Sequence, residues 1–262
     1  MNRLKSRIAT GDMVAAAWVE LGNPDVAEIM VRHGWETIVI DGEHGIGDVE
    51  RWVAVARAVE AAGGDVVLRL PDGADTTIKR AIDRGFTSFI VPMVNTADQA
   101  RDIVASFLYP PHGRRGYAAP ILRASNWGVR TGYARDEAHG DVLIMLQCEH
   151  VDAVANLPEI AAVEGIGAIF IGPNDLAASA GHLEDMLHEN VQTLLGRIEQ
   201  VANDLDVPLA TIIGAGRDWG DLRELGYRFV IGPNDVSLLI EGARRSCAHR
   251  DGQCQKDGPR RY

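Results

Sequence analysis

Three features of the sequence predict a single (β/α)8 barrel. Short apolar runs alternate with longer amphipathic runs, and about eight such strand–helix pairs follow one another along the chain. The 262 residues are about the length that one barrel of this kind takes. No stretch of linker composition divides the series, which favours one closed barrel over an open, doubly wound sheet.

The expected strands are short runs of apolar, often β-branched residues, as is typical of strands that are buried on both faces. The run Ile38-Val39-Ile40 is the clearest, because it passes directly into Asp41-Gly42, as an inner strand does where it opens into a loop. The strands are expected at Met13–Val19, Thr37–Asp41, Val66–Arg69, Phe89–Pro92, Val142–Glu149, Ala168–Ile171, Pro208–Ile213 and Phe229–Ile231.

The expected helices are longer segments in which apolar residues recur at helical spacing. Pro24 suits a first helical turn, whereas Gly63-Gly64 and Gly85 suit the ends of the helices that precede them. The helices are expected at Pro24–His33, Asp48–Ala61, Asp75–Arg84, Ala97–Phe107, Gly128–His139, Val151–Leu157, His188–Leu205, Asp218–Leu225 and Ser237–Arg245.

Two stretches fall outside this alternation. Tyr109–Asn126 is long and irregular, and long loops inside compact domains are usually functional or disordered. The last residues, Cys247–Tyr262, are almost all polar or charged. We therefore expect a barrel domain over residues 1–246 and a polar tail over residues 247–262, either loose or docked on a partner.

The composition excludes several classes of partner. The formal net charge of −11 argues against nucleic acid, whose phosphates need a basic surface. No apolar run approaches the roughly 20 residues of a membrane span, and Val14–Val19 is too short for a signal peptide. Cys148, Cys247 and Cys254 lack paired spacing and fit a reducing compartment. We therefore expect a cytoplasmic protein with no membrane or nucleic-acid partner.

Polar side chains follow the strand at Thr37–Asp41, and the carboxyl ends of barrel strands are where chemistry is placed. Asp41, Glu43 and His44 are therefore candidates for acid–base work. In an Asp41–His44 dyad, the carboxylate would fix the imidazole tautomer and raise its basicity. The alternative is a simple turn, in which Asp41 bonds to its own backbone and His44 lies in solvent.

The strand at Val142–Glu149 carries a second candidate group. Side chains alternate along a strand, so Gln147 and Glu149 face the barrel interior while Cys148 packs under the outer helices. Asp175 leaves the neighbouring strand, about 4.8 Å away, and two carboxylates at that spacing repel unless a cation lies between them. A divalent ion bound through oxygen ligands would offset the repulsion between the two carboxylates. The alternative for each carboxylate is a helix cap or a loop charge.

The basic residues narrow the possible mechanisms. Arg69 ends its strand and offers a planar fork for a carboxylate or a developing oxyanion, although a salt bridge to a loop acid is the alternative. The lysines are Lys5, Lys79 and Lys256, and none of them ends an expected strand. This placement argues against Schiff-base catalysis, so carbonyl chemistry would use a metal ion as Lewis acid.

One pentapeptide occurs twice. Ile171-Gly-Pro-Asn-Asp175 recurs as Ile231-Gly-Pro-Asn-Asp235, each time at a strand exit. We expect both copies to form a tight turn into a helix capped by Asn or Asp, and only one of them need be chemical.

Six short stretches carry a family resemblance. They are Ile40-Asp-Gly-Glu-His44, Val67-Leu-Arg69, Tyr109-Pro-Pro-His-Gly-Arg-Arg-Gly116, Arg123-Ala-Ser125, Gln147-Cys-Glu149 and Phe170-Ile-Gly-Pro-Asn-Asp-Leu176. In this order they resemble the HpcH/HpaI aldolases, class II pyruvate aldolases such as 4-hydroxy-2-oxoheptanedioate aldolase and 2-dehydro-3-deoxyglucarate aldolase. The resemblance implies a barrel of the phosphoenolpyruvate/pyruvate type.

The resemblance also implies roles for single residues. Glu149 and Asp175 would hold a divalent metal, either Mg²⁺, Mn²⁺ or Co²⁺, and no organic cofactor is expected. Gln147 would lie beside the keto acid, and Arg69 would bind its carbonyl oxygen and stabilise the enolate. His44, paired with Asp41, would be the acid–base group. The implied substrate contacts are Gly172, Pro173 and Asn174 near the pyruvate carboxylate, Trp18 and Ile212 on the aldehyde side, and Ser125.

The activity implied is reversible aldol cleavage of 4-hydroxy-2-oxo acids to pyruvate and an aldehyde. The family resembled forms trimers of dimers that exchange the last barrel helix, here Ser237–Arg245, so a homo-oligomer is expected. One alternative is a lyase for CoA thioesters of the citramalyl or malyl type. Another is a phosphate-binding barrel isomerase, because Gly214-Ala-Gly216 and Gly232-Pro233 follow strands 7 and 8, where such barrels seat phosphate.

Overall fold

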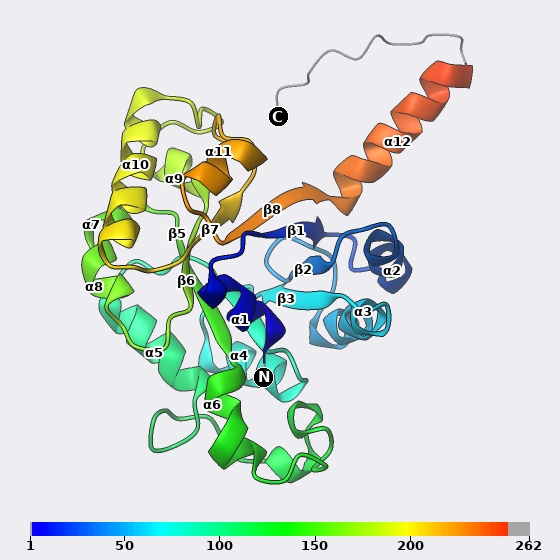
Figure 1. Ribbon diagram of the computed structural model, residues 1–262, viewed down its shortest axis with the longest axis vertical. Helices are drawn as coiled ribbons and strands as arrows, with labels where there is room; N and C mark the ends of the chain where they lie inside the picture. Colours follow the sequence, from blue (N-terminus) through cyan, green and yellow to red (C-terminus); the bar gives the residue numbers. More distant parts are fainter. Residues whose placement is uncertain (1, 251–262) are drawn as a thin grey trace.

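The computed structural model describes residues 2–250, in which eight parallel strands close into one barrel (Figure 1). Neighbours along the chain are neighbours in the barrel, and β8 pairs with β1 to close it. The strands are β1 (Val14–Val19), β2 (Thr37–Asp41), β3 (Asp65–Arg69), β4 (Ser88–Val91), β5 (Leu143–Cys148), β6 (Ala168–Ile171), β7 (Leu209–Ile212) and β8 (Phe229–Asn234). The predicted fold class is confirmed.

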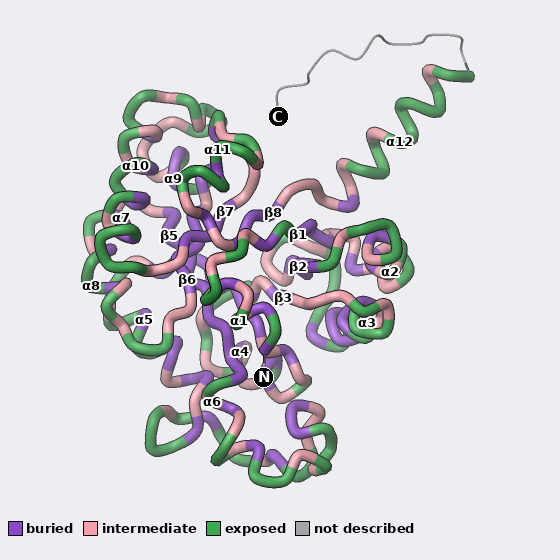
Figure 2. Tube along the Cα trace, in the orientation of Figure 1, coloured by how far each residue is buried: buried purple, intermediate pink, exposed green. Residues whose placement is uncertain are grey.

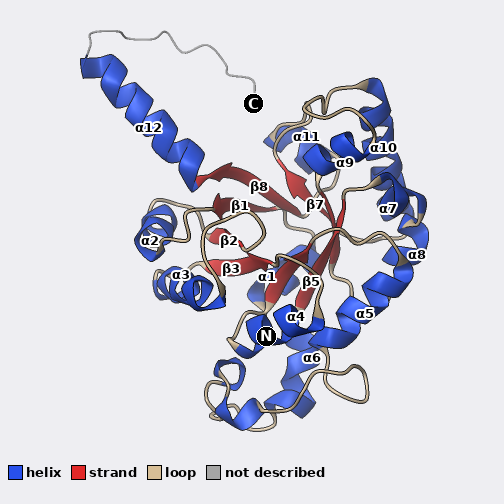
Figure 3. Cartoon of the chain, turned by 180° about the vertical axis from the view of Figure 1, so that it is seen from behind, coloured by secondary structure: helices blue, strands red, loops and turns tan. Residues whose placement is uncertain are grey.

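Most of the helices lie around the outside of the strands, whereas α12 projects away from them, as Figure 3 shows. They are α1 (Arg3–Thr10), α2 (Pro24–Arg32), α3 (Val49–Ala61), α4 (Asp75–Asp83), α5 (Ala97–Phe107), α6 (Ala138–Asp141), α7 (Val151–Ala155), α8 (Leu157–Ala161), α9 (Pro173–Ser179), α10 (Glu189–Asp204), α11 (Trp219–Glu224) and α12 (Asp235–Arg250). None of the described helices is long and apolar enough to cross a membrane.

Alternation along the strands divides the apolar residues into two cores. One core lies between the strands and the outer helices, and a smaller one fills the barrel interior; the buried strands are purple in Figure 2. On β5, Leu143 and Met145 belong to the interior core, whereas Cys148 belongs to the outer one, as predicted. This alternation aims Gln147 and Glu149 at the carboxyl-end mouth.

Helix α1 closes the amino end of the barrel and is not among the helices expected from the sequence. Leu4 and Ile8 belong to the interior core. The Asn2 side chain caps α1 through the Lys5 N–H and donates to Thr87 O at 3.1 Å. The helix has only two buried residues in two turns, so its apolar periodicity is short and easily overlooked.

The other differences concern the end of α12 and the helix predicted at Gly128–His139, where only the last two residues belong to an α-helix, α6. Helix α12 continues to Arg250, so the predicted tail from Cys247 begins inside a helix of alanine and arginine, which are good helix formers. Residues 251–262 of that tail lie outside the described residues. The long stretch after α5 contains two single 3-10 turns, Ala119–Ile121 and Arg123–Ser125, followed by a π-helical turn at Tyr133–Glu137.

Candidate active site

An arginine and an aspartate from neighbouring strands form an ion pair at the carboxyl end of the barrel. Asp41 and Arg69 are partners in the β2–β3 register. Arg69 Nε and Nη2 donate to the two Asp41 oxygens at 2.9 and 2.5 Å, and Nη1 lies 3.1 Å from a Glu43 oxygen. These contacts occupy one N–H on each nitrogen, so each Nη keeps a second N–H for a ligand. Arg69 thus pairs with the strand residue Asp41 and with the loop acid Glu43, and it retains donors for a substrate.

Asp41 is almost completely buried and is surrounded by donors. Besides Arg69, the main-chain N–H groups of Glu43 and His44 donate to its Oδ1 at 3.0 and 3.2 Å. Burial raises the pKa of Asp41, but hydrogen bonds from Arg69 and Glu20 and the guanidinium charge outweigh burial and hold the pKa at about 2. The side chain is therefore an anion at neutral pH.

His44 does not form the predicted dyad with Asp41. Its imidazole is 67% exposed, and Nε2 lies 3.9 Å from a Glu43 oxygen. The contact between His44 and Asp41 is made by the main-chain N–H, as the alternative interpretation expected. The predicted pairing is wrong because Arg69, on the adjacent strand, takes both Asp41 oxygens. His44 still lies in the loop after β2, with its ring exposed beside Glu43.

The other half of the mouth is built by Gln147, at the end of β5, and Glu149. Both side chains are buried; Gln147 Nε2 donates to Glu149 Oε2, and the Met93 N–H donates to Oε1 at 2.8 Å. Within residues 2–250, Gln147 Oε1 is a buried acceptor without a hydrogen-bond partner. Burial, aided by the charges of Asp175 and Glu43, raises the pKa of Glu149 to about 7 against the hydrogen bonds it accepts. A nearby cation would relieve this cost of ionisation.

Gly172 allows the chain to pass close to Glu149. A Cβ at position 172 would lie 2.4 Å from Glu149 Oε2, which leaves room only for glycine. Helix α9 begins directly afterwards, with Gly172 at its N-cap and Pro173 at its first position. Pro173 has no N–H, so any contact that it makes with a substrate carboxylate cannot be a main-chain hydrogen bond. Asn174 and Asp175 lie exposed in the first turn.

The oxygen atoms of this group fit a divalent cation. Glu149 and Asp175 offer carboxylates from adjacent strand exits, and the unpaired Gln147 Oε1 adds a neutral oxygen. Mg²⁺ and Mn²⁺ prefer oxygen donors and keep several waters or substrate atoms as ligands. In the described part of the chain, no group of three or more His, Cys, Asp or Glu side chains could hold a metal. Water or substrate would therefore have to complete the coordination.

Comparison with known proteins establishes the family. The family model for HpcH/HpaI aldolase/citrate lyase matches residues 15–242. The chain belongs to this family. It is 36% identical over 257 residues to a hydroxypyruvate/pyruvate aldolase of Cupriavidus necator, an alignment that covers 94% of this chain and 91% of that protein. It is 39% identical over 254 residues to a 4-hydroxy-2-oxovalerate aldolase of Novosphingobium aromaticivorans, with 93% and 92% covered.

Solved structures agree with this assignment. An HpcH/HpaI aldolase/citrate lyase family protein from Burkholderia cenocepacia matches with a TM-score of 0.89 and 31% identity, covering 96% of this chain and all of that one. A citrate lyase β subunit from M. tuberculosis, solved with oxaloacetate and magnesium, has a TM-score of 0.55 at 13% identity, covering 90% and 96%. The second match shows the fold alone, whereas the first supports the identification of this chain as an enzyme of the aldolase family.

Trp18 and Ile212, which were predicted to contact the aldehyde, lie at the mouth of the barrel, whereas Ser125 does not. Trp18 and Ile212, near the carboxyl ends of β1 and β7, belong to the interior core, and Arg69 Cζ lies 4.6 Å from the Trp18 ring centre. The Ser125 hydroxyl is buried in the excursion after α5, where it donates to Leu122 O at 3.0 Å. That excursion leads to the amino end of β5, so the prediction for Ser125 is wrong within this chain.

Sequence reasoning missed one acid of the aldolase mouth, Glu20. This residue follows β1 directly, and its carboxyl forms a hydrogen bond with Asp41. Burial, with the contact to Asp41, raises the pKa of Glu20 to about 8. The signal that could have revealed it is the one used for Asp41, an acid placed directly where an inner strand stops.

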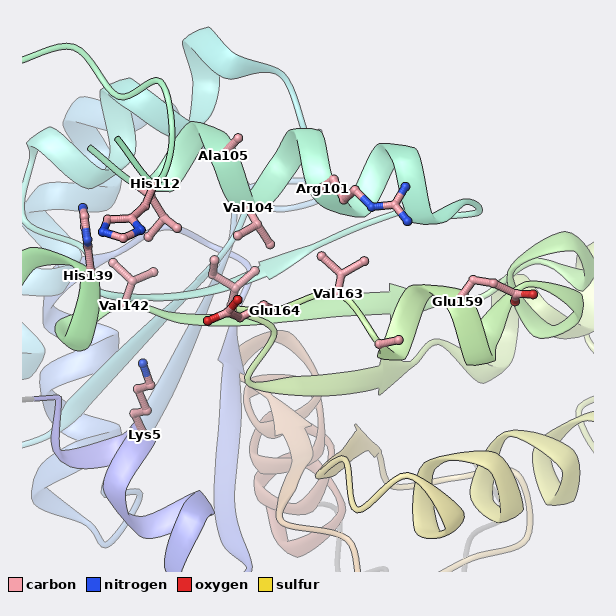
Figure 4. A pocket seen from close by; sticks show the side chains of 14 residues that line it. Lys5, Arg101, Val104, Ala105, His112, His139, Val142, Glu159, Val163 and Glu164 are labelled. Atoms are coloured by element: carbon pink, nitrogen blue, oxygen red, sulfur yellow. The ribbon is translucent and has the colours of Figure 1, made fainter. Parts of the chain in front are cut away.

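A cavity of about 650 Å³ lies away from the mouth, near the amino ends of β5 and β6 (Figure 4). It is bordered by Lys5 of α1, by His112 and His139 from the excursion after α5, and by the apolar side chains Val104 and Val142. None of the predicted site residues lines it. The candidate site of the aldolase is therefore at the opposite end of the strands.

Proposed function

We propose that this family member catalyses divalent-metal-dependent, reversible aldol cleavage of 4-hydroxy-2-oxo acids to pyruvate and an aldehyde. The observation that carries the proposal is the convergence of two groups at one mouth. Arg69 keeps N–H donors there, and the buried Glu149–Gln147 pair offers oxygen ligands. The names of the relatives, pyruvate-type aldolases, support pyruvate or a hydroxylated pyruvate as the keto acid.

Glu149 and Asp175 would hold the ion, and the unpartnered Gln147 Oε1 is a further oxygen beside Glu149. A divalent ion, when bound, acts as a Lewis acid on the keto acid. The magnesium in the citrate lyase structure supports such an ion in general terms. The residues present suit Mg²⁺, Mn²⁺ or Co²⁺, all of which accept oxygen ligands.

The residues on the other side of the mouth supply binding and proton transfer. Arg69 donates to the C2 oxygen, on which negative charge develops as the C3–C4 bond breaks. His44, directly or through a water, takes the proton of the C4 hydroxyl, because its imidazole is exposed beside Glu43 in the loop that follows β2. Asp41 holds the arginine rather than the histidine.

The test is exchange of the pyruvate methyl protons with solvent, followed by NMR. Arg69→Ala should abolish exchange because the developing oxyanion loses its donor, whereas Mn²⁺ binding measured by calorimetry should persist. Arg80→Ala, which removes an exposed ion pair with Glu50, is the matched control and should behave as wild type. Exchange at a near wild-type rate in Arg69→Ala would overturn the role given to Arg69.

Metal and cofactor requirements separate the alternatives. Chelation with EDTA should stop pyruvate release from a 4-hydroxy-2-oxo acid, and added Mn²⁺ or Mg²⁺ should restore it without CoA. Activity that needs a CoA thioester, or that resists chelation, would contradict the proposal. The comparisons do not favour the thioester lyase, because the citrate lyase match is only 13% identical whereas the aldolases match at 36–39%.

We also propose a homo-oligomer, expected to be a trimer of dimers, in which copies exchange α12. The helix projects away from the barrel (Figure 1) and exposes Leu238, Leu239 and Ile240. An apolar cavity of about 320 Å³ lies between its first turns and α2, bordered by Met30 and Trp35. Leu239→Asp should lower the molar mass measured by light scattering. A variant with the same mass as wild type, or a wild-type protein that is already monomeric, would contradict the exchange of α12.

We also propose a cytoplasmic location, as expected from the cysteines.

A further inference from the structure

Three titratable side chains at the carboxyl ends of three neighbouring strands lie in a row at the aldolase mouth. In the β1–β2 register Trp18 pairs with Val39, and Val19 pairs with Ile40. The next step of that register sets Glu20 beside Asp41, and Asp41 is in turn the partner of Arg69. Aligned residues on adjacent strands point to the same side, so the row acid–acid–arginine faces one space.

The main chain at Glu20 is held from two directions. Its N–H donates to Asp235 Oδ1 at 2.9 Å, at the start of α12, and its carbonyl accepts the Ile46 N–H at 2.7 Å. The Leu21 N–H donates to the second Asp235 oxygen at 3.1 Å. These bonds fix where the Glu20 side chain starts and leave it little freedom beside Asp41.

The bond between the two carboxyl groups requires a proton. The other partners of Asp41 are all donors, namely the Arg69 guanidinium and the main-chain N–H groups of Glu43 and His44. Asp41 is therefore the acceptor, because a carboxylate with these partners is strongly stabilised as an anion. A hydrogen bond from Glu20 to Asp41 then places the shared proton on Glu20.

We propose that Glu20 is a positioning residue, which donates this hydrogen bond to Asp41 and thereby fixes the Arg69 guanidinium against the keto acid. The inference rests on the proposed aldolase function and adds a residue to it. Glu20 touches neither the substrate nor the ion in this scheme. It acts by keeping Asp41 oriented edge-on to Arg69, so that the second N–H of each Nη stays aimed at the mouth.

When Glu20 loses its proton, it can no longer donate to Asp41 and no longer helps to orient Arg69. Ionised Glu20 would repel Asp41 and Asp235 and compete with Asp41 for Arg69, while Glu43 already occupies Nη1. Burial, Asp41 and Asp235 raise the pKa of Glu20 to about 8, although Arg69 lowers it. The arginine should therefore lose its orientation, and activity should fall, as the pH rises through about 8.

The experiment measures pyruvate proton exchange between pH 6 and 9 with metal held saturating. Wild type should lose about tenfold between pH 7 and 9, since a group one unit above its pKa is about 90% ionised. Glu20→Gln keeps an N–H donor for Asp41 and cannot ionise, so it should stay active and lose the alkaline decline. Glu20→Leu should be roughly tenfold slower at every pH because the donor is gone.

Glu224→Gln, an exposed glutamate on α11, is the matched control and should retain the wild-type profile. Melting temperatures confirm that the variants fold. A wild-type alkaline decline in Glu20→Gln, or wild-type rates in Glu20→Leu, would overturn the proposal.

A second readout does not depend on aldolase activity. The infrared difference between wild type and Glu20→Gln should show a protonated carboxyl at pH 7 that disappears with a midpoint near pH 8. Absence of that band would contradict the inference, whether or not the enzyme has aldolase activity. If the band is present and wild type shows no exchange, the proposed function fails while the protonated Glu20 stands. If exchange occurs but Glu20→Gln matches wild type in both readouts, the inference alone fails.

Discussion

The two copies of Ile-Gly-Pro-Asn-Asp lie at corresponding places in the barrel and do different things. At Ile171–Asp175, β6 ends and α9 begins at the proline, so that Asp175 is exposed in the first turn. At Ile231–Asp235, β8 continues through the asparagine and α12 begins at Asp235, which is 3% exposed. Only the second copy has the predicted asparagine cap, because Asn234 Oδ1 accepts the Ser237 N–H at 2.6 Å.

The neighbouring strands explain this difference. Beside β8, the end of β1 presents the N–H groups of Glu20 and Leu21, and Asp235 accepts both. Beside β6, the end of β5 presents Glu149, which is itself an acid, and the Asp175 carboxylate accepts no hydrogen bond within residues 2–250. Identical local sequence therefore yields a structural clamp in one place and, in the other, an exposed carboxylate that we propose as a metal ligand.

The largest contrast should come from changing each aspartate to asparagine. Asp175→Asn should lower kcat by at least about a hundredfold, because a proposed ligand loses its charge, with unfolding free energy within about 0.5 kcal/mol of wild type. Asp235→Asn should lower the free energy of unfolding by about 1–3 kcal/mol through its weakened bonds to two N–H groups. Urea unfolding and steady-state kinetics on both variants check this. Equal effects of the two changes on activity would break the comparison.

Changing the glycine of each copy to alanine should produce smaller effects than changing its aspartate. In Gly172→Ala, the new Cβ would lie 2.4 Å from Glu149 Oε2, so Glu149 must move and kcat should fall roughly tenfold. In Gly232→Ala, the Cβ would lie 2.7 Å from the Trp219 ring, and repacking should cost about 1–3 kcal/mol of stability. Mn²⁺ titration by calorimetry should show weaker binding in Gly172→Ala only. Unaltered metal affinity in that variant would contradict the role of the close approach.

The asparagines should give the smallest effects. Asn234→Ala removes the cap of α12 and should destabilise the protein by about 1 kcal/mol. Asn174→Ala removes an exposed side chain and should change the unfolding free energy by less than about 0.5 kcal/mol. Chemical denaturation monitored by circular dichroism measures both. A larger loss in Asn174→Ala than in Asn234→Ala would show that the first copy is also capped by its asparagine.

Several parts of the site were accessible to sequence reasoning because they depend on period and position along one strand. Alternation placed Gln147 and Glu149 inside the barrel and Cys148 outside it, and the strand exits located Asp41, Arg69 and Asp175. The family motifs then named their expected chemistry. The helical periodicity of apolar residues did not predict α1, because two buried apolar residues in two turns make a weak signal.

The sequence by itself determined the closed barrel and the acids at its mouth, because apolar periodicity and the positions of strand ends are properties of local sequence. Only the tertiary structure decided that Asp41 holds Arg69 instead of His44, that Ser125 lies at the other end, and that Glu20 lies beside Asp41. Those outcomes depend on which residues register and packing bring together, and on how far they are removed from water. Charge distances and desolvation are set by the packed fold, and neither is encoded in any single stretch of the chain.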